Sequence, residues 1–243
     1  MVQGSPPQNT DSHAEPGSID VGGLKAALRS KLRKKRASFT RGLGSDGTRD
    51  AAQQMADHLL AMTMPSAEAV VALYRAQGSE IDPSFLAEPM LERGVSLCLP
   101  VVPGPDRALL FRKWVPGDAL EPGPFGTEHP LLKAPEIVPD VLLVPLIGYD
   151  LDGRRLGQGG GYYDRTLAQL RESREAVLAI GVAFTCQQVP IGEVPEEFTD
   201  LRLDGIVTEQ GGQLFPSNRL ARLRDIWARR EGGLRQPSYR IRE

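Results

Sequence analysis

The sequence predicts an α/β protein that is built on a mostly parallel sheet. Short apolar runs alternate with segments of helical spacing along most of the chain. Val141–Ile147 is a nearly unbroken apolar run, as expected of a strand that is buried on both faces. Strands that alternate with helices favour a parallel sheet flanked by helices, and we expect one domain.

Composition narrows the class of protein. The 243 residues suffice for one large α/β domain or two small ones, and 40% hydrophobic residues can supply a core. A net charge of −2 gives no overall field for nucleic acid. Cys98 and Cys186 lack metal or redox spacing, although Cys98 lies in an apolar run and is predicted to be a buried thiol. The three histidines are far apart, which does not favour a zinc site.

Neither a membrane span nor a secretory signal is predicted. A span needs about 18 consecutive apolar residues, and the sequence has no such run. The first residues also lack the apolar stretch of a signal peptide. We therefore expect a soluble, cytoplasmic protein.

The predicted organisation is a domain between two tails. Residues 1–19 are rich in Pro, Gly, Ser and Gln and are expected to be disordered. The α/β domain is expected over residues 20–230, followed by a basic tail over residues 231–243. Its remaining elements are predicted as helices over Arg49–Met62, Asp82–Glu92, Tyr162–Leu170 and Ser217–Arg230, and strands over Ala69–Tyr74, Val95–Val101, Ala108–Trp114, Val141–Ile147, Val177–Phe184 and Leu203–Val207.

The first predicted helix is strongly basic. Asp20 is a suitable N-cap for a helix through Phe39, with Leu24, Leu28 and Leu32 as its apolar stripe. Basic residues are frequent along this segment. We interpret residues 31–36 as a solvated face, whereas Lys25 and Arg29 lie next to the apolar stripe, one turn apart.

Two loop segments are predicted. Gly42–Gly47 matches the pattern G-x-G-x-x-G, but it follows a basic helix and not a strand, so it is interpreted as a plain loop. Residues 116–139 are rich in proline and are expected to be irregular, and such a long loop is usually functional or disordered. Trp114, Phe125 and His129 in and beside it are predicted to form an aromatic wall.

The most informative stretch is Asp150–Leu167, which reads D-L-D-G-R-R-L-G-Q-G-G-G-Y-Y-D-R-T-L. It joins a predicted buried strand to a predicted helix. Its glycines permit close approach of a ligand to the backbone, and N–H groups at a helix N-terminus favour phosphate. Arg154 and Arg155 add donors for phosphate oxygens, and Asp164 could hold a Mg²⁺ ion that bridges phosphates.

This stretch resembles the signature of the 5-formyltetrahydrofolate cyclo-ligase family, also called 5,10-methenyltetrahydrofolate synthetases. The resemblance rests on R-L-G-Q-G-G-G-Y-Y-D-R preceded by G-Y-D-L-D-G, and in weaker form it extends from about Lys25 to Glu209. It implies a Rossmann-like, three-layer α/β fold like that of ribose-5-phosphate isomerase and the CoA transferases. It also implies ATP-dependent conversion of 5-formyltetrahydrofolate to 5,10-methenyltetrahydrofolate, through phosphorylation of the formyl oxygen.

The resemblance also implies residue roles. Arg155 and Asp164 are the predicted catalytic residues, and Asp164 with Asp200 would bind Mg²⁺. K-A-A-L-R at the first helix resembles the family's K-x-x-L-R. The full set expected to bind ATP is Lys25, Arg29, Arg155, Leu156, Gly157, Gln158, Gly159, Gly160, Gly161, Tyr162 and Tyr163.

The resemblance also implies a set of residues that bind the folate. Glu80, in G-S-E-I-D, matches an acid of the family that contacts the folate, and the expected substrate-binding set is Glu80, Arg75, Trp114, Phe125 and Tyr162. Gln158 and Gly160 depart from some relatives, which carry aromatic or basic residues there. The expected partners are therefore reduced folate and ATP, bound by a monomer.

Two other functions remain open on the sequence alone. The basic segments Lys25–Arg41 and Arg219–Arg242 could form an RNA-binding face, although few aromatic residues are interleaved with them. A sugar-phosphate isomerase of the same fold would need neither ATP nor Mg²⁺. Against other enzyme classes, the sequence has no G-x-x-x-x-G-K-[ST] and no G-x-S-x-G.

Overall fold

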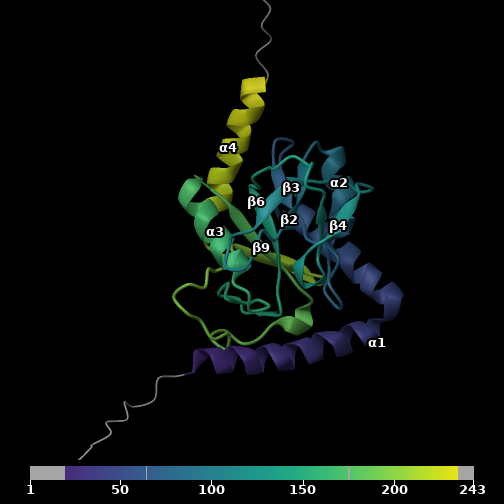
Figure 1. The fold of residues 1–243 in the computed structure, drawn as a ribbon, viewed down its shortest axis with the longest axis vertical. Coiled ribbons are helices and arrows are strands. Elements are labelled where there is room, and N and C mark those ends of the chain that lie inside the picture. Colours follow the sequence, from purple (N-terminus) through teal and green to yellow (C-terminus); the bar gives the residue numbers. More distant parts are fainter. Residues whose placement is uncertain (1–19, 64, 175, 235–243) are drawn as a thin grey trace, which may run out of the picture.

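A seven-stranded sheet forms the centre of the protein in the computed structural model, which describes residues 20–63, 65–174 and 176–234 (Figure 1). Its strand order is β11-β10-β9-β6-β1-β2-β3. The bounds are β1 Val70–Ala72, β2 Ser96–Val101, β3 Leu110–Lys113, β6 Val141–Pro145, β9 Leu178–Val182, β10 Gly205–Thr208 and β11 Gly211–Leu214.

The sheet is mostly parallel, as predicted. β10, β9, β6, β1 and β2 pair in parallel, while β11 and β3 add one antiparallel strand at each edge. All residues of β9 and β10 are buried, which agrees with their continuous apolar sequences. The predicted buried strand at 141–147 is confirmed for Val141–Pro145.

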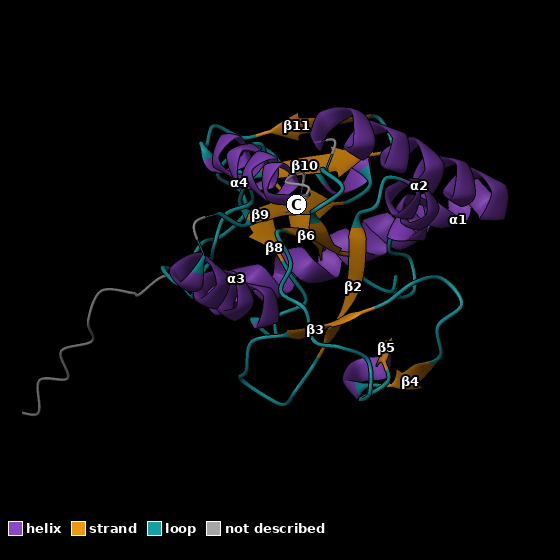
Figure 2. Cartoon of the chain, turned by 90° about the horizontal axis from the view of Figure 1, so that it is seen from above, coloured by secondary structure: helices purple, strands orange, loops and turns teal. Residues whose placement is uncertain are grey.

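Helices cover both faces of this sheet. They are α1 Val21–Thr63, α2 Ala87–Glu92, α3 Tyr162–Ser173 and α4 Arg219–Leu234. Buried side chains from the second half of α1, from α2 and from α4 share one core cluster with the sheet, and Leu167 of α3 belongs to a second cluster. Figure 2 shows α3 on one side of the sheet and α2 on the other. The three-layer α/β architecture that we predicted is therefore present.

The first half of α1 lies along the edge where the glycine loop opens (Figure 1). Leu32 packs there with Ile147 and Leu156, in a small third cluster. The predicted apolar stripe is only partly correct, because Leu24 is 51% exposed while Leu32 is buried. Arg36 contradicts the predicted solvated face: its side chain is buried, whereas residues 31 and 33–35 are exposed as expected.

The predicted loop at Gly42–Gly47 is wrong. Helix continues on both sides of one kinked residue, Gly44, whose φ of 71° belongs to the left-handed region that glycine tolerates. Thr48 Oγ1 donates to the Gly44 carbonyl across the kink. A single glycine therefore redirects α1 without a loop, and its second half turns to pack Met55 and Leu59 into the core.

The proline-rich segment 116–139 is more ordered than we expected. It contains a small antiparallel pair, β4 Leu120–Pro122 with β5 Glu128–Pro130, and a 3₁₀ turn at Pro124–Gly126. Phe125 in that turn has a φ of 60°. A second small pair, β7 Gly148–Tyr149 with β8 Arg155–Leu156, frames the turn that precedes the glycine loop.

The chain ends differ partly from expectation. α4 continues to Leu234, beyond the predicted end at Arg230. The predicted disordered tail, residues 1–19, and residues 235–243 of the basic tail lie outside the described residues. Among the helices of the described ranges, none has the length and apolar character needed to cross a bilayer.

Candidate active site

Three connections meet at the carboxyl edge of the parallel strands. They follow β1, β6 and β9, which lie side by side in the sheet. β1 leads through α2 to β2 on one side, whereas β6 leads through α3 to β9 on the other. The border between β1 and β6 is thus a topological switch point, where open α/β sheets bind ligands.

The glycine loop after β8 leads directly into α3. Gly159 has a φ of 108°, and Gly161, the N-cap of α3, has a φ of 65°, which residues with side chains rarely adopt. A Cβ atom at Gly159 would lie 3.5 Å from the Arg29 guanidinium carbon. Arg29 Nε donates to the Gly157 carbonyl at 2.8 Å, so a cationic side chain of α1 contacts the loop. This arrangement joins a cationic side chain to the N-terminus of a helix, as a phosphate site requires.

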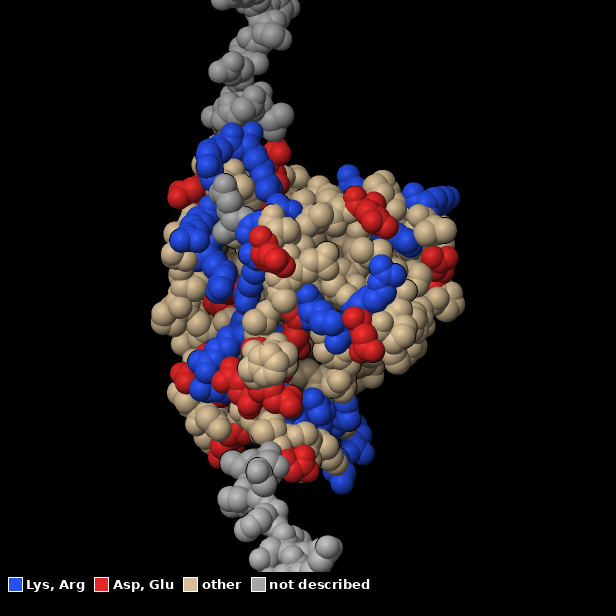
Figure 3. Space-filling view, turned by 60° about the vertical axis from the view of Figure 1, so that its left-hand side comes forward, with Lys and Arg blue, Asp and Glu red and all other residues tan. Residues whose placement is uncertain are grey.

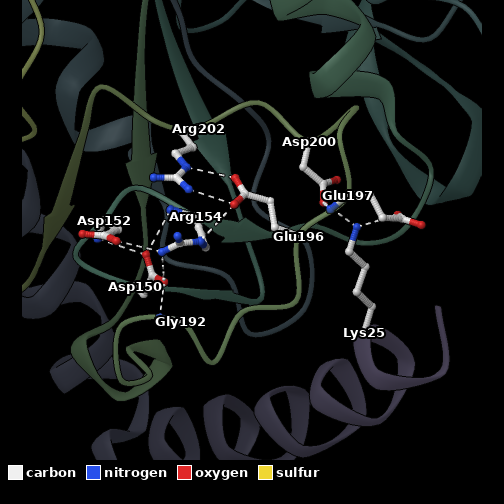
Figure 4. A network of polar contacts seen from close by, with 9 residues as sticks. All are labelled: Lys25, Asp150, Asp152, Arg154, Gly192, Glu196, Glu197, Asp200 and Arg202. Atoms are coloured by element: carbon white, nitrogen blue, oxygen red, sulfur yellow. Dashed lines mark hydrogen bonds and ion pairs between the residues drawn. The ribbon is translucent and has the colours of Figure 1, made fainter. Parts of the chain in front are cut away.

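Lys25 lies one turn before Arg29 and is buried between two acids. Its Nζ atom is 2.7 Å from Glu197 Oε2 and 2.5 Å from Asp200 Oδ2 (Figure 4). Burial by itself lowers the pKa of Lys25, but the hydrogen bonds to Asp200 and Glu197 outweigh it, so the pKa is raised above its ordinary value. Lys25 therefore carries its charge at neutral pH and holds the β9–β10 connection against α1.

Arg155 and Asp164 face each other across the start of α3. Arg155 Nη2 donates to Asp164 Oδ1 at 2.6 Å, and the Leu201 backbone N–H donates to the same oxygen at 3.0 Å. Asp200 precedes Leu201, so the structure brings Asp164 and Asp200 to one corner. Arg155 Nη1 is buried and has no hydrogen-bond partner among the described residues. We interpret this unsatisfied buried donor as a candidate contact for an anionic ligand.

Arg154 is engaged by carboxylates and not positioned as a free phosphate donor. It contacts Asp150 at 3.2 Å, Asp152 at 2.9 Å and Glu196 at 3.0 Å. Arg202 donates to Glu196 in turn (Figure 4). Hydrogen bonds from Arg202 and then Arg154 lower the pKa of Glu196. Arg154 therefore ties the β9–β10 connection to the turn before the glycine loop, and the expectation that it grips phosphate needs correction.

Glu80 lies on the neighbouring connection, after β1. Its side chain is only 7% exposed. The Gln77 backbone N–H donates to Oε2 and the Gln158 side-chain amide donates to Oε1, both at 3.1 Å. Arg36 Nη1 lies 3.8 Å from Oε1, on the buried side. An acid of the expected folate site and a residue of the expected phosphate loop are therefore in direct contact.

The β4–β5 hairpin lies beside this edge. Arg75 forms an ion pair with Glu128 at 3.2 Å, and Gln77 Nε2 donates to the Phe125 carbonyl at 3.5 Å. Phe125 is 75% exposed, and the centroid of its ring lies 6.0 Å from that of Tyr162. Phe125 and Tyr162 thus offer aromatic surface at the mouth of the site.

The remaining predicted residues lie deeper. Trp114 is 5% exposed and belongs to the core cluster with Tyr74 and Ile81, so the structure does not present it as an open wall. Tyr163 packs against the second cluster, and burial raises its pKa. The ring of His129 lies near Glu121 within the hairpin.

Sequence reasoning missed Arg36, Glu196 and Glu197 as parts of the site. Arg36 stands four residues after Leu32 and seven after Arg29, and this helical spacing is a signal that places all three on one face. Glu196 and Glu197 lie in a polar loop without periodicity, so their pairing with Arg154 and Lys25 required the fold. Within the described residues, no cluster of three or more His, Cys, Asp or Glu is suited to hold a metal ion.

Comparison with known proteins identifies the family. A model of the 5-formyltetrahydrofolate cyclo-ligase family matches residues 21–209. The 5-formyltetrahydrofolate cyclo-ligase of Haemophilus influenzae is 31% identical over 185 residues, which cover 74% of this chain and 95% of that protein. The Escherichia coli K12 protein of the same name is also 31% identical, over 173 residues that cover 69% of this chain and 93% of the relative.

Solved structures agree with these sequence relatives. The NMR structure of Aquifex aeolicus 5,10-methenyltetrahydrofolate synthetase superposes with a TM-score of 0.66 and 28% identity, covering 81% of this chain and 95% of that one. The 5,10-methenyltetrahydrofolate synthetase of Mycoplasma pneumoniae gives a TM-score of 0.58 and 25% identity, covering 76% and 98%. Together with the glycine loop and its surrounding charges, these matches show that the chain belongs to the 5-formyltetrahydrofolate cyclo-ligase family.

Proposed function

We propose that this protein converts 5-formyltetrahydrofolate and ATP into 5,10-methenyltetrahydrofolate, ADP and phosphate. One observation carries the proposal: the glycine loop, with Arg29 and Arg155 against it, opens at the same sheet edge as the nearly buried acid Glu80. The proposed phosphate site and the proposed site for a hydrogen-bonding ring would thus be adjacent. The relatives named above carry this activity in their names.

The chemistry needs positioning and charge more than a covalent nucleophile. The formyl oxygen of an amide leaves poorly, and phosphorylation by ATP converts it into a phosphate that leaves readily. N10 of the folate then attacks the activated carbon, the carbon–oxygen bond breaks, and phosphate departs with that oxygen. Arg155, Arg29 and Lys25 would stabilise the transferring phosphoryl group electrostatically. Asp164 holds Arg155 in place at 2.6 Å.

Glu80 would orient the folate. A carboxylate accepts two parallel hydrogen bonds, which matches the N–H edge of a pterin ring. Its side chain is held by the Gln77 backbone N–H and the buried Arg36, so the acceptor has a defined direction. Phe125 and Tyr162 at the mouth supply aromatic surface for the remainder of the substrate.

Asp164 and Asp200 fit a magnesium ion that is bound together with the nucleotide. Hydrogen bonds from described residues use Asp164 Oδ1 and Asp200 Oδ2, and the second oxygen of each carboxylate remains as a donor to a metal. Mg²⁺ is usually held by one or two carboxylates plus phosphates and water, so a site with two acids is sufficient. The ion would neutralise phosphate charge during transfer.

We propose that the protein acts as a monomer. α1, the connection after β1, the glycine loop and the β9–β10 connection contribute residues to the candidate site. Light scattering after size-exclusion chromatography would test the oligomeric state. We also propose that the protein acts in the cytoplasm, because its proposed substrates, reduced folate and ATP, are intracellular metabolites.

The RNA-binding alternative has less support. On the face shown in Figure 3, Lys and Arg side chains gather towards the end where α4 projects. However, Arg219 and Arg230 of α4 pair with the buried acids Asp204 and Asp140 at 2.7 and 2.9 Å, so these two partly exposed cations already have counter-charges within the fold. A sugar-phosphate isomerase would make no use of the Asp164–Asp200 corner.

An activity assay tests the proposal directly. The purified protein should form the methenyl product, followed by its near-ultraviolet absorbance, only when ATP and Mg²⁺ are both present. ADP should appear in equal amounts. Turnover without ATP, or ATP hydrolysis without the chromophore, would contradict the proposal. A thermal-shift screen with MgATP, folinic acid, a sugar phosphate and RNA would then show which alternative ligand, if any, stabilises the fold.

A further inference from the structure

Gln158 connects the glycine loop to Glu80. Its Oε1 atom accepts a hydrogen bond from Arg33 Nη2 at 2.7 Å, while its Nε2 atom donates to Glu80 Oε1 at 3.1 Å. A side-chain amide can accept at its oxygen and donate from its nitrogen at the same time. The same residue therefore belongs to the phosphate loop by its backbone and to the folate acid by its side chain.

The contact covers the accessible side of Glu80. Three groups surround this carboxylate: the buried Arg36, the Gln77 backbone N–H and the Gln158 amide. Arg36 is 6% exposed and Gln77 contributes main chain, whereas Gln158 is an exposed side chain. With Glu80 itself only 7% exposed, Gln158 is the neighbour that can move aside at low cost.

Arginines hold the loop that carries Gln158. Arg29 donates to the Gly157 carbonyl at 2.8 Å, Arg33 to the Gln158 carbonyl at 3.5 Å, and Arg165 to the Gly160 carbonyl at 2.6 Å. Phosphate oxygens are stronger acceptors for guanidinium groups than neutral carbonyls. A nucleotide at this loop would therefore draw arginines away from the carbonyls, and Gly157 and Gly159 on either side of Gln158 give the backbone freedom to adjust.

We propose that Gln158 couples the two substrates: it closes Glu80 in the free enzyme, and nucleotide binding at the glycine loop releases it so that the pterin ring can bind. This inference rests on the proposed function, because it takes the glycine loop as the phosphate site and Glu80 as the pterin acceptor. Coupling between two binding sites is reciprocal, so folate must raise nucleotide affinity by the same factor.

Gln158→Met tests the coupling. Methionine keeps the length of the side chain but forms neither hydrogen bond. The dissociation constant of 5-formyltetrahydrofolate is measured by calorimetry with and without a non-hydrolysable ATP analogue and Mg²⁺. In the unmodified protein the analogue should tighten folate binding at least about fivefold, the lower end of typical couplings. In the absence of nucleotide, Gln158→Met should bind folate more tightly than the unmodified protein does. The factor by which the ATP analogue tightens folate binding should then fall close to one.

Two further variants define the effect. Gln169→Ala removes an exposed glutamine from α3 and should keep the coupling of the unmodified protein. Arg33→Met removes the hydrogen bond to Gln158 Oε1 and the longer one to the Gln158 carbonyl but keeps the contact with Glu80, so nucleotide should still tighten folate binding, by a smaller factor than in the unmodified protein. The reverse titration, nucleotide with and without folate, must give the same factor in every variant.

The outcomes separate this inference from the proposed function. If the unmodified protein does not bind both folate and nucleotide, the proposed function is wrong, and so is the coupling that rests on it. If both ligands bind but the factor is already close to one, or if Gln158→Met keeps the original factor, only the role of Gln158 is overturned.

Discussion

Arg155 and Asp164 form the contact on which the proposed phosphoryl transfer depends most. The Arg155 side chain is 5% exposed, and its 2.6 Å contact with Asp164 fixes the guanidinium before any ligand arrives. A cation held in this way loses little freedom when a phosphate binds. Preorganised donors of this kind act mainly on the rate of the chemical step.

Removing either partner should slow the reaction without unfolding the protein. Arg155→Ala and Asp164→Ala are each expected to lower kcat by about 10²–10³-fold, the usual effect of losing one preorganised electrostatic contact. Steady-state kinetics measures the change, and circular dichroism checks the fold. Arg93→Ala and Asp57→Ala, at exposed positions on α2's C-cap and on α1, are the matched controls and should retain normal rates. Near-normal kcat/KM in either test variant would show that its residue has no role in the chemistry.

Glu80→Gln should weaken folate binding far more than ATP binding. Glutamine keeps the shape but replaces one acceptor by a donor, which then faces a pterin N–H of the same kind. An unsatisfied buried donor costs about 1–3 kcal/mol, or roughly 5- to 150-fold in affinity. Two titrations measure this effect: folate at saturating ATP, and ATP at saturating folate. An unchanged folate KM, or equal changes in both KM values, would place the pterin elsewhere.

At the scale of single residues, the sequence marked the glycine loop clearly and the surroundings of Glu80 poorly. The glycines, Lys25 and Arg29 are close in sequence to recognisable patterns, and the structure brings Arg29 and the loop into contact. Arg36 was misjudged because a charged residue within a basic run is usually solvated. It is buried here because it donates to Ser79 and to the Leu146 carbonyl, both far from it in sequence.

The β9–β10 connection is the element that shapes the side of the candidate site where we propose that nucleotide binds. It has little regular structure of its own, and ionic contacts hold it in place. Lys25 binds Glu197 and Asp200, and Arg154 binds Glu196. The Gly192 N–H also donates to the buried carboxylate of Asp150 at 3.0 Å. The position of Asp200 thus depends on charges that lie outside the loop.

This dependence predicts a pH effect on stability through Glu196. Its pKa lies below the ordinary value of 4.5, mainly because Arg202 and then Arg154 donate hydrogen bonds to it. A carboxylate whose pKa is lower in the folded state stabilises the fold above its unfolded pKa, and this contribution is lost as the pH falls through the folded pKa. Glu196→Gln should therefore melt below the unmodified protein at pH 7, and the difference should shrink as the pH falls below 4.5.

Thermal melts across that pH range provide the measurement. Glu172→Gln, at an exposed position on α3, is the control and should melt like the unmodified protein at every pH. A melting difference that stays constant from pH 7 to pH 3 would mean that Glu196 acts through packing and not through its charge.

Helices and strands with a clear local sequence pattern were predicted better than those without one. The central strands are continuous apolar runs because both faces of a parallel sheet are covered, and they were placed correctly. β11 and the β4–β5 and β7–β8 pairs are short and polar, and pairing with other segments stabilises them, so no local pattern marks them. The kink at Gly44 replaced an expected loop because one glycine at positive φ is enough to reorient α1.

For the molecule as a whole, the candidate site and the buried acids that anchor α4 lie at opposite edges of the sheet. The candidate site lies at the carboxyl edge of the parallel strands. Asp140 and Asp204 precede β6 and β10, at the opposite edge, and are buried. Asp204 binds Arg171 and Arg219, and Asp140 binds Arg174 and Arg230. These two acids pin both ends of α4, which follows the segment that the family model matches.

Asp140→Asn should therefore reduce stability without changing catalysis. Asp140 accepts from Arg174 at 2.7 Å, from Arg230 at 2.9 Å and from the Val70 backbone N–H at 3.0 Å, and it is 0% exposed. An asparagine leaves two partly exposed guanidinium groups without their counter-charge and places a neutral amide in the buried position of the acceptor. Leaving a buried polar group imperfectly satisfied in this way costs about 1–3 kcal/mol. For a chain of this size, that corresponds to a fall in Tm of roughly 2–12 °C.

Kinetics at a temperature where the variant is fully folded distinguishes a loss of stability from an effect on the candidate site at the other edge of the sheet. KM for folate and for ATP should stay within about twofold of normal, because the carboxylate lies at the amino ends of the strands and the substrates would bind at the carboxyl ends. Asp57→Asn, on the exposed face of α1, should change neither Tm nor kinetics. If Asp140→Asn lowers kcat/KM tenfold while its Tm stays normal, then α4 and its anchors act on the site itself, and the separation inferred from the topology is wrong.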